Sequence, residues 1–410
     1  MVENTKIPAI RFAGFTEAWE QRKLGDIADI VGGGTPSTGN PSYWDGEIDW
    51  YAPAEIADQI YANSSQKKIT DLGYENSSAK MLSPGTVLFT SRAGIGKTVI
   101  LTRKGCTNQG FQSIVPHRGE LDSYFIFSRT EELKRYGELV GAGSTFVEVS
   151  GKQMAAMELM MPPTMREQQT IGGFFQQLDN LITLHQRKYD KLTNIKKSML
   201  EKMFPKNGSN VPEFRFKGFT EAWEQRKLSE MSSLITKGTT PLDKSNTGNV
   251  NFVKIESIDE ASGEITITKK ITNEEHEGYL RRSQLKENDI LFSIAGTLGR
   301  VTSVKSSILP ANTNQALAII RCKSGDLQYV KTYLKGKVVS DYIKKNPTIG
   351  AQPNLSLEQV GNLEIAIPIL DEQKKIGKYF SELDNLITLH QRKLEKLKNI
   401  KKSMLEKMFV

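Results

Sequence analysis

The chain has 410 residues, of which 38% are hydrophobic and 25% are charged, and its formal net charge is +8. This balance is typical of a globular protein and excludes a disordered or a membrane chain. No stretch approaches the ~20 apolar residues of a spanning helix, and the opening MVENTKIPAIRF lacks the apolar core of a signal peptide, so we expect a cytoplasmic protein without a membrane segment. Two cysteines and four scattered histidines predict neither a disulfide framework nor a metal site.

The first element in chain order is a short segment that occurs twice. RFAGFTEAWEQRKL (Arg11–Leu24) returns as RFKGFTEAWEQRKL (Arg215–Leu228), with thirteen of fourteen positions identical. An internal repeat of this kind indicates two copies of one structural unit. A chain of this length is also expected to form two or three domains.

The segment after the first copy, residues 25–163, is expected to be a compact α/β domain. Short β-branched and aromatic runs such as TVLFTS, KTVILT and QSIVP are separated by Gly, Pro and Asn, which is typical of strands and turns. A helical stretch, SYFIFSRTEELKRYGELV, follows them. We place the first domain, with its N-terminal repeat segment, at residues 1–165.

SRAGIGKT, beginning at Ser91, resembles the end of a phosphate-binding loop. That loop requires a glycine where Ser91 stands, and the corresponding SIAGTLGR of the second half has Arg300 in place of the lysine Lys97. LVGAGSTF fails the dinucleotide pattern at Phe146. Every catalytic or nucleotide motif breaks at a residue that its chemistry needs, so we expect no catalytic residue. An NTPase that uses Lys97 is a minor alternative.

Residues 166–204 are predicted to form a long helix, and residues 371–409 repeat them at 29 of 39 positions. Apolar residues recur at alternating spacings of four and three, as in the seam of a coiled coil. The predicted seam consists of Ile171, Phe175, Leu178, Ile182, His185, Tyr189 and Leu192 in the first copy and Ile376, Phe380, Leu383, Ile387, His390, Leu394 and Leu397 in the second.

The two copies are expected to pack antiparallel, because the second variable segment must leave the end of one helix and return to the start of the other. The pseudo-twofold axis then passes near Arg187 and Arg392. This arrangement predicts that His185 lies opposite Leu394 and that His390 lies opposite Tyr189, each as a partly buried seam residue.

PKNGSN marks a linker, at residues 205–214, between the two halves. A second α/β domain is expected at 215–370, with runs such as NFVKI and DILFSI, and the second copied helix at 371–410. The copied helices contain seven basic against four acidic and ten basic against six acidic residues, which is nearly all of the net charge. This excess is explained by a solvated outer face, by a stripe facing phosphates, or by a docking surface for an acidic partner. Because exposed positions are copied too, a partner present in two copies is favoured.

The two variable segments align only at short islands, GGTP with GTTP, VLFTSRAGIGK with ILFSIAGTLGR, and TNQ with TNQ. Basic and amide side chains gather there, and such groups can bond guanine and adenine edges or phosphates, although ordinary surface chemistry explains any single one. The DNA-binding candidates are Thr35, Lys67, Lys68, Arg92, Lys97, Asn108, Gln109, Ser144, Lys237, Thr239, Lys254, Arg281, Arg282, Arg300, Asn314 and Gln315.

The chain contains, twice in the same order, the motif RFxGFxxxWxxxKL, a variable segment with its islands, and a helix ending KKSMLEKMF. This order resembles the specificity (S) subunit of type I restriction–modification systems. The resemblance covers essentially the whole chain. It implies two α/β target recognition domains, each reading half of a bipartite asymmetric DNA site, joined by two long helices that form an antiparallel coiled coil with a pseudo-twofold internal repeat. It also implies that the helices set the gap between half-sites.

The partners that this resemblance implies are double-stranded DNA, two methyltransferase (M) subunits and restriction (R) subunits. Catalysis would reside in those subunits, with S-adenosylmethionine, ATP and Mg²⁺ bound there and no cofactor in this chain. A stand-alone pseudo-dimeric DNA-binding regulator and a scaffold with two modules are the alternatives, and both would use the same geometry without a methyltransferase.

Overall fold

The computed structural model describes residues 6–56, 59–92, 94–142, 148–206, 209–243, 245–259, 263–345 and 354–410. The chain divides into two compact units. The first comprises Met1–Leu184 and Glu395–Val410, and the second comprises His185–Leu394. Each unit therefore holds one variable segment together with parts of both long helices, so the helices are shared between the units and do not form a separate body. None of the helices in the described ranges is both long and apolar enough to span a membrane.

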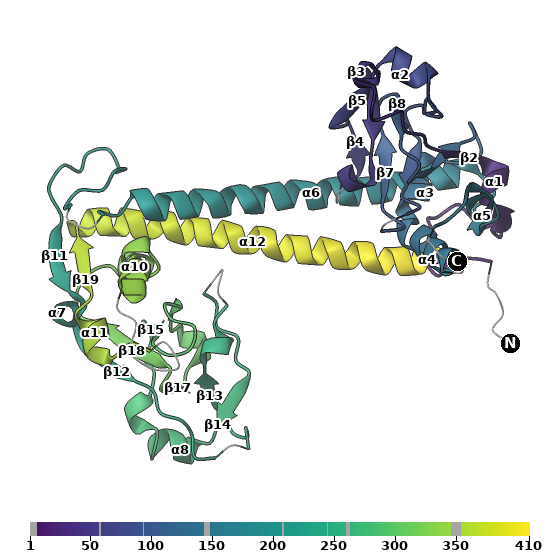
Figure 1. Cartoon of the computed structure of the whole chain (residues 1–410). Coiled ribbons are helices and arrows are strands. Elements are labelled where there is room, and N and C mark those ends of the chain that lie inside the picture. The colour runs from purple at the N-terminus through teal and green to yellow at the C-terminus, as the bar shows by residue number, and fades with distance from the viewer. Residues whose placement is uncertain are drawn as a thin grey trace. The chain divides into compact units, whose positions relative to one another are not determined.

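The first unit has three sheets, with strand orders β1-β10, β2-β9-β6-β7-β4 and β5-β3-β8 (Figure 1). All pairs are antiparallel except β3 with β8 and β4 with β7. Its strands are β1 (Glu20–Lys23), β2 (Ala28–Gly32), β3 (Trp44–Tyr51), β4 (Tyr61–Ala62), β5 (Lys67–Ile69), β6 (Val87–Phe89), β7 (Thr98–Leu101), β8 (Gly105–Thr107), β9 (Gln112–Pro116) and β10 (Glu158–Met161). Its short helices are α1 (Leu24–Ile27), α2 (Asp71–Glu75), α3 (Ser123–Ser128), α4 (Thr130–Gly141) and α5 (Gly151–Ala155).

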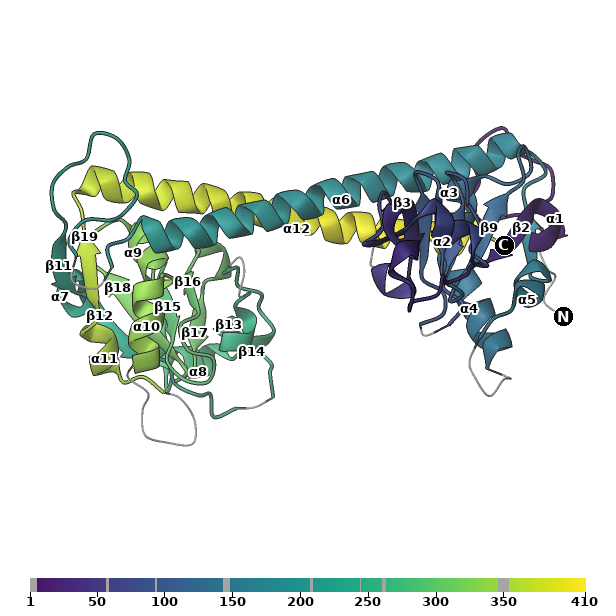
Figure 2. The same ribbon diagram turned by 45° about the horizontal axis from the view of Figure 1, so that its top comes forward.

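The second unit repeats this plan, with strand orders β11-β19, β12-β18-β15-β16 and β14-β13-β17 (Figure 2). Its strands are β11 (Glu224–Lys227), β12 (Ser232–Lys237), β13 (Val250–Val253), β14 (Lys269–Ile271), β15 (Ile290–Ser293), β16 (Val301–Ser303), β17 (Ala311–Thr313), β18 (Leu317–Cys322) and β19 (Glu364–Ile367). Its short helices are α7 (Leu228–Met231), α8 (Asn273–Glu277), α9 (Leu327–Leu334), α10 (Lys337–Lys345) and α11 (Leu357–Gly361).

The same capping chemistry starts equivalent helices in both units. Asp122 accepts hydrogen bonds from the first-turn amides of α3, at 3.0 and 2.8 Å, and Asp326 accepts one at 2.9 Å in α9. Ser150 with Gln153, and Ser356 with Gln359, form capping boxes at α5 and α11. These caps supply partners for orphan backbone amides, so sequences that otherwise differ begin their helices at the same place in the fold.

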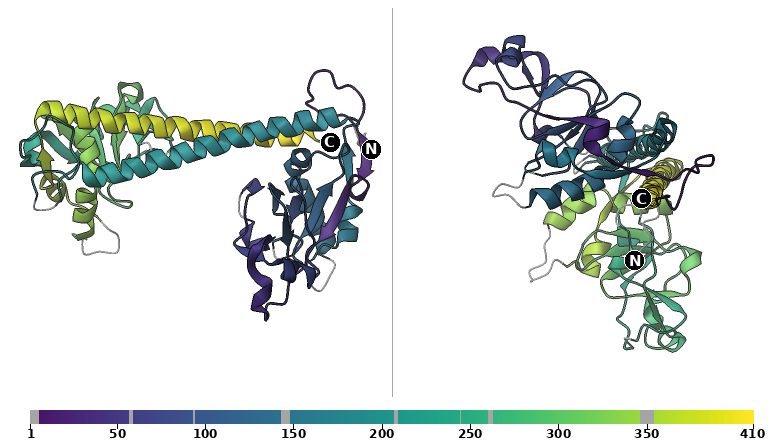
Figure 3. Two further views of the ribbon diagram at one scale, coloured as in Figure 1. Left: turned by 90° about the horizontal axis from the view of Figure 1, so that it is seen from above. Right: turned by 90° about the vertical axis from the view of Figure 1, so that its right-hand side faces the viewer.

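The two long helices are α6 (Met165–Lys202) and α12 (Leu370–Met408). In the second unit α6 residue numbers rise as α12 numbers fall, because Lys196 binds Asp384 at 2.5 Å and the Phe204 ring stacks on Phe380. In the first unit, Asp179 binds Lys401 at 2.6 Å and the C-terminal end of α12 lies beside the start of α6 (Figure 3). The helices are thus antiparallel in each unit, and none of the fourteen predicted seam residues is exposed.

The copied segments form the socket that holds the end of each long helix. In the first unit, the Trp19 and Phe125 rings pack against Phe409, at the end of α12, with centroids 6.3 and 5.6 Å away. In the second unit, Trp223 packs against Phe204, at the end of α6, at 6.3 Å. Each long helix starts in one unit and ends in the core of the other, so the two sockets and the two helix ends must match. This requirement accounts for the copied tryptophans, Trp19 and Trp223, and for the copied phenylalanines at the helix ends, Phe204 and Phe409.

A second copied contact closes each socket. Arg11 forms a two-pronged ion pair with Glu167, at 2.7 and 2.8 Å, and Arg215 does the same with Glu372, at 2.7 Å for both prongs. Both glutamate side chains are buried. The paired carboxylate raises the pKa of each arginine through its hydrogen bond. The RFxGF segment is therefore tied to the first turn of the long helix that follows it about 150 residues later in the chain.

The predicted pairing of the seam histidines is wrong. His185 lies opposite His390, with the two Nδ1 atoms 2.8 Å apart, and not opposite Leu394. The two histidines occupy equivalent positions of the repeat, so equivalent residues of the two helices meet there and not at the expected Arg187 and Arg392, about two residues further along each helix. Burial, followed by Lys393 and Lys188, lowers the pKa of His185. Burial, His185 and the same two lysines lower the pKa of His390.

Candidate nucleic-acid interface

In the first unit, the GGTP turn is held against the TNQ loop. A β-carbon on Gly33 would lie 2.0 Å from the Asn108 carbonyl oxygen, so this approach requires glycine. The Gly34 amide donates to the Thr107 carbonyl at 2.8 Å, and the Thr35 hydroxyl donates to Oε1 of Gln109. Two sequence islands that are more than 70 residues apart thus form one local structure.

The second unit holds the same islands in the same way. A β-carbon on Gly238 would lie 2.1 Å from the Thr313 carbonyl oxygen, and the Thr239 amide donates to that oxygen at 2.9 Å. The hydroxyl that binds Gln315 belongs to Thr240, and the DNA-binding candidate Thr239 is the residue before it. Aligning GTTP with GGTP would have identified Thr240 as the equivalent of Thr35. We call this paired turn and loop the shared frame, residues 33–36 with 107–110 and residues 238–241 with 313–316.

Both predicted asparagines serve the loop of this frame. Oδ1 of Asn108 accepts the Gly110 amide at 2.8 Å, and Oδ1 of Asn314 accepts the Ala316 amide at 3.2 Å. Each oxygen therefore shapes its own turn, while Gln109 and Gln315 are exposed beside it. The asparagines hold the loop shape and the glutamines lie at its surface.

The SRAGIGKT segment forms a hairpin turn and not a phosphate cradle. Gly94 and Gly96 both have positive φ, and the Thr90 hydroxyl accepts the Lys97 amide at 3.0 Å. Ser293 does the same for the Arg300 amide at 2.7 Å in the second unit. The segment therefore joins β6 to β7, as its counterpart joins β15 to β16.

Several predicted cations have partners within the protein. Arg92 pairs with Glu148 at 2.7 Å and Lys254 with Glu256 at 3.2 Å. Arg300 donates to two backbone carbonyls at 3.3 and 3.2 Å and so supports the domain. The Nζ of Lys67 lies 5.8 Å from the Trp44 ring centroid. Lys97 and Lys237 are exposed, Lys68 is half-buried, and Ser144 lies outside the described residues.

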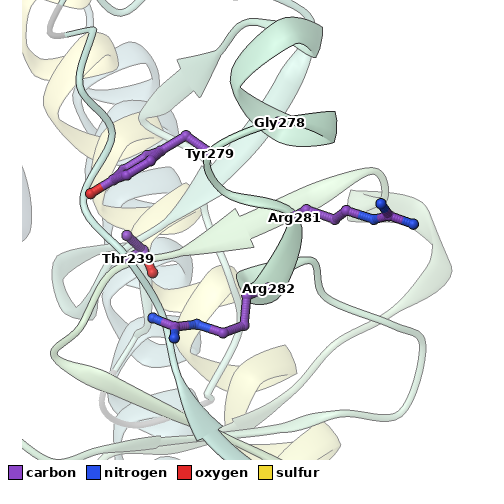
Figure 4. A pocket seen from close by; sticks show the side chains of 5 residues that line it. All are labelled: Thr239, Gly278, Tyr279, Arg281 and Arg282. Atoms are coloured by element: carbon purple, nitrogen blue, oxygen red, sulfur yellow. The ribbon is translucent and has the colours of Figure 1, made fainter.

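The second unit has an open pocket of about 520 Å³ beside its frame (Figure 4). In Figure 4 the Arg282 guanidinium points toward Thr239, whereas Arg281 points away from it. The Tyr279 side chain borders the opening and is 55% exposed. The pocket is cationic and suits an anionic or electron-rich ligand. Its lining residues are Thr239, Gly278, Tyr279, Arg281 and Arg282.

The two cysteines carry thiols that are not activated. Burial raises the pKa of the Cys106 and Cys322 thiols to about 11, so neither is a thiolate nucleophile at neutral pH. No group of three or more metal-ligating side chains lies close together within the described ranges. The copied helices also carry an exposed apolar surface that occurs twice. Leu181 and Leu184 are exposed on α6, and Leu386 and Leu389 are exposed on α12.

The fold defines a class of protein with two repeated α/β domains, each carrying the same frame, on antiparallel helices. A sequence model of the type I restriction modification DNA specificity domain matches residues 16–194 and again 220–399. The chain therefore belongs to this family, with two copies of the domain, and the resemblance to type I specificity subunits is confirmed.

Relatives and solved structures agree with this assignment. The MjaIX specificity subunit of Methanocaldococcus jannaschii is 26% identical over 406 residues, covering 95% of this chain and 92% of that protein. The MjaVIII specificity subunit of the same organism is 23% identical over 401 residues, covering 95% and 91%. The crystal structure of the type I S subunit from M. genitalium superimposes with a TM-score of 0.60 at 15% identity, covering 98% of this chain and 99% of the other. The predicted fold class is confirmed.

Proposed function

We propose that this chain is a DNA-recognition subunit in which each α/β domain reads one half of a bipartite asymmetric site. The observation that carries the proposal is the shared frame, built twice with the same hydrogen bonds and surrounded by different side chains. One scaffold with two different surroundings suits the recognition of two different half-sites. The catalytic steps of methylation and cleavage, with S-adenosylmethionine, ATP and Mg²⁺, then belong to partner subunits.

The long helices are proposed to set the gap between the half-sites. At about 1.5 Å per residue, the 38 residues of α6 extend about 57 Å. This length corresponds to about one and a half turns of DNA at 34–36 Å per turn. Because the end of each helix is anchored in a socket, its length cannot change without moving an anchored residue.

The copied helices are also proposed to dock two methyltransferase subunits. Exposed leucines at equivalent positions, Leu181 and Leu184 on α6 and Leu386 and Leu389 on α12, give two identical apolar faces. Copied charges surround them, for example Arg187-Lys188 and Arg392-Lys393. Identical faces suit identical partners, and a two-copy partner explains why exposed positions are repeated. Restriction subunits would join the larger complex through this assembly.

The test is to express the chain with its cognate methyltransferase subunit in a host that lacks adenine methylation and to map methylated adenines across the genome. A bipartite motif with a fixed gap is the expected result. Leu181→Ser with Leu386→Ser is expected to abolish co-purification of the methyltransferase and the methylation, and Leu139→Ser is the matched exposed control. Bipartite DNA binding by the chain alone, with no methyltransferase recruited, would instead support a stand-alone regulator.

A further inference from the structure

The shared frame has the same hydrogen bonds in both domains, so these bonds cannot by themselves distinguish two half-sites. In each domain a threonine hydroxyl binds a glutamine and a glycine lies against a loop carbonyl. Groups that discriminate between base sequences must therefore lie beside the frame, where the two domains differ. One segment meets this condition in both units.

That segment begins and ends at positions that are held by equivalent hydrogen bonds in the two units. At its start, Thr70 caps α2 and Thr272 caps α8, each directly after the identical letters KKI. At its end, the Leu82 amide donates to Gly105 and the Leu285 amide donates to Ala311, both at 2.9 Å. Between these points the sequences DLGYENSSAKM and NEEHEGYLRRSQ have little in common. The hydrogen bonds of the frame are thus constant, and the segment beside the frame is variable.

The two segments place different side chains beside the frame, a neutral one in the first unit and a cationic one in the second. In the first unit, a β-carbon on Gly34 would lie 2.3 Å from Oγ of Ser78, so a small neutral residue lies against the turn. In the second unit, Thr239 takes the place of Gly34, and Arg282 points toward it across the pocket (Figure 4). The same place beside the frame therefore holds a serine in one domain and a guanidinium in the other.

The two arginines are available for a ligand. Within the described residues, neither Arg281 nor Arg282 forms a side-chain hydrogen bond or ion pair, and both are exposed. Arg321 of the same domain differs, because it is held by Asp289 through two bonds of 2.7 Å. No hydrogen bond or ion pair within the described residues accounts for the presence of these two guanidinium groups at the pocket.

We propose that Arg282 reads a guanine in the half-site of the second domain and that Arg281 contacts a phosphate. This assignment rests on the function proposed above. The planar guanidinium offers two parallel donors that match O6 and N7 of guanine in the major groove, a pairing that other bases do not offer. Arg282 points into the pocket beside the frame, where a base edge would enter. Arg281 points away from Thr239, so it is assigned to a phosphate and not to the same base.

The experiment maps methylated adenines for the wild type and for Arg282→Gln, Arg282→Lys and Arg281→Gln, each co-expressed with the methyltransferase subunit. Arg282→Gln is expected to relax one guanine position in one half-site, with the preference reduced roughly tenfold or more. Arg282→Lys keeps the charge but loses the planar fork, so it should relax the same position. Arg281→Gln should keep the full consensus and lower the methylation of all sites together.

The alternative outcomes are distinct. If Arg282→Gln keeps every guanine of the consensus and only lowers methylation, Arg282 contacts a phosphate and the assignment is overturned. If Arg281→Gln and not Arg282→Gln relaxes a base, the two roles are assigned wrongly. If the wild type produces no bipartite motif, the proposed function has failed and not this assignment. Because both side chains are exposed, melting temperatures and co-purification with the methyltransferase should match the wild type, which excludes misfolding.

Discussion

Replacing Phe204 by alanine should remove the anchor that holds the end of α6 in the second unit. Its side chain is only 4% exposed. Its ring lies 5.4 Å from Tyr333, 5.8 Å from Tyr329, 5.9 Å from Phe380 and 6.3 Å from Trp223, measured between centroids. Truncating a buried phenylalanine costs about 3–5 kcal/mol in free energy of unfolding, because a cavity remains and four aromatic contacts are lost.

For a unit of this size, about 1 kcal/mol corresponds to about 2–4 °C in melting temperature, so the transition of the second unit should fall by about 10 °C. Scanning calorimetry of the full chain measures this shift. Phe204→Leu keeps most of the volume and should cost less than about 1.5 kcal/mol. Phe214→Ala, at a position 49% exposed, is the matched control and should change little. If Phe204→Ala melts like Phe214→Ala, the socket explanation for the copied helix ends is wrong.

Three further outcomes are expected. Because the pKa values of His185 and His390 are lowered, the folded pair binds fewer protons than the unfolded chain below about pH 6.5. Thermal stability should therefore be full above that pH and fall on acidification. Replacing both histidines by leucine should flatten this pH dependence of the melting temperature. Arg215→Met leaves the buried Glu372 carboxylate without its cation and should cost roughly 2–4 kcal/mol in urea unfolding, and adding Glu372→Gln should recover part of that loss. Seven residues inserted at the midpoints of both α6 and α12 lengthen each helix by about 10 Å, and the gap of the methylated motif should grow by about three base pairs with unchanged half-site bases. A changed half-site in that last experiment would refute the spacer role.

Local pattern was enough to predict the architecture of this protein. The repeat of RFxGFTEAWEQRKL and the alternating spacing of four and three residues along the copied helices are properties of short segments. They indicated two equivalent α/β domains and a pair of packed helices, and the return path of the second variable segment indicated that the pair is antiparallel. The broken phosphate-loop pattern at Ser91 and Arg300 was also visible in the sequence itself, because a required glycine and a required lysine are absent there.

The details of the site depended on contacts between residues far apart in the chain. Arg11 meets Glu167 across 156 positions, and Thr240 was recognised as the partner of Gln315 only when two loops were brought together. The helix register could not be derived from the seam alone, because a shifted register keeps every apolar residue in the seam. The contact between His185 and His390 shows which register the two helices adopt.

The sequence by itself also ranked the cations equally, and the fold separated them. The Arg300 guanidinium donates hydrogen bonds to two carbonyls of its own domain, and Arg92 forms an ion pair with Glu148. Arg281 and Arg282 lie at an open pocket instead. Whether a basic side chain has a partner within the protein depends on neighbours that the chain brings together by folding. The sequence therefore determined the repeated architecture, and the tertiary structure determined which basic side chains have partners within the protein and which lie at an open pocket.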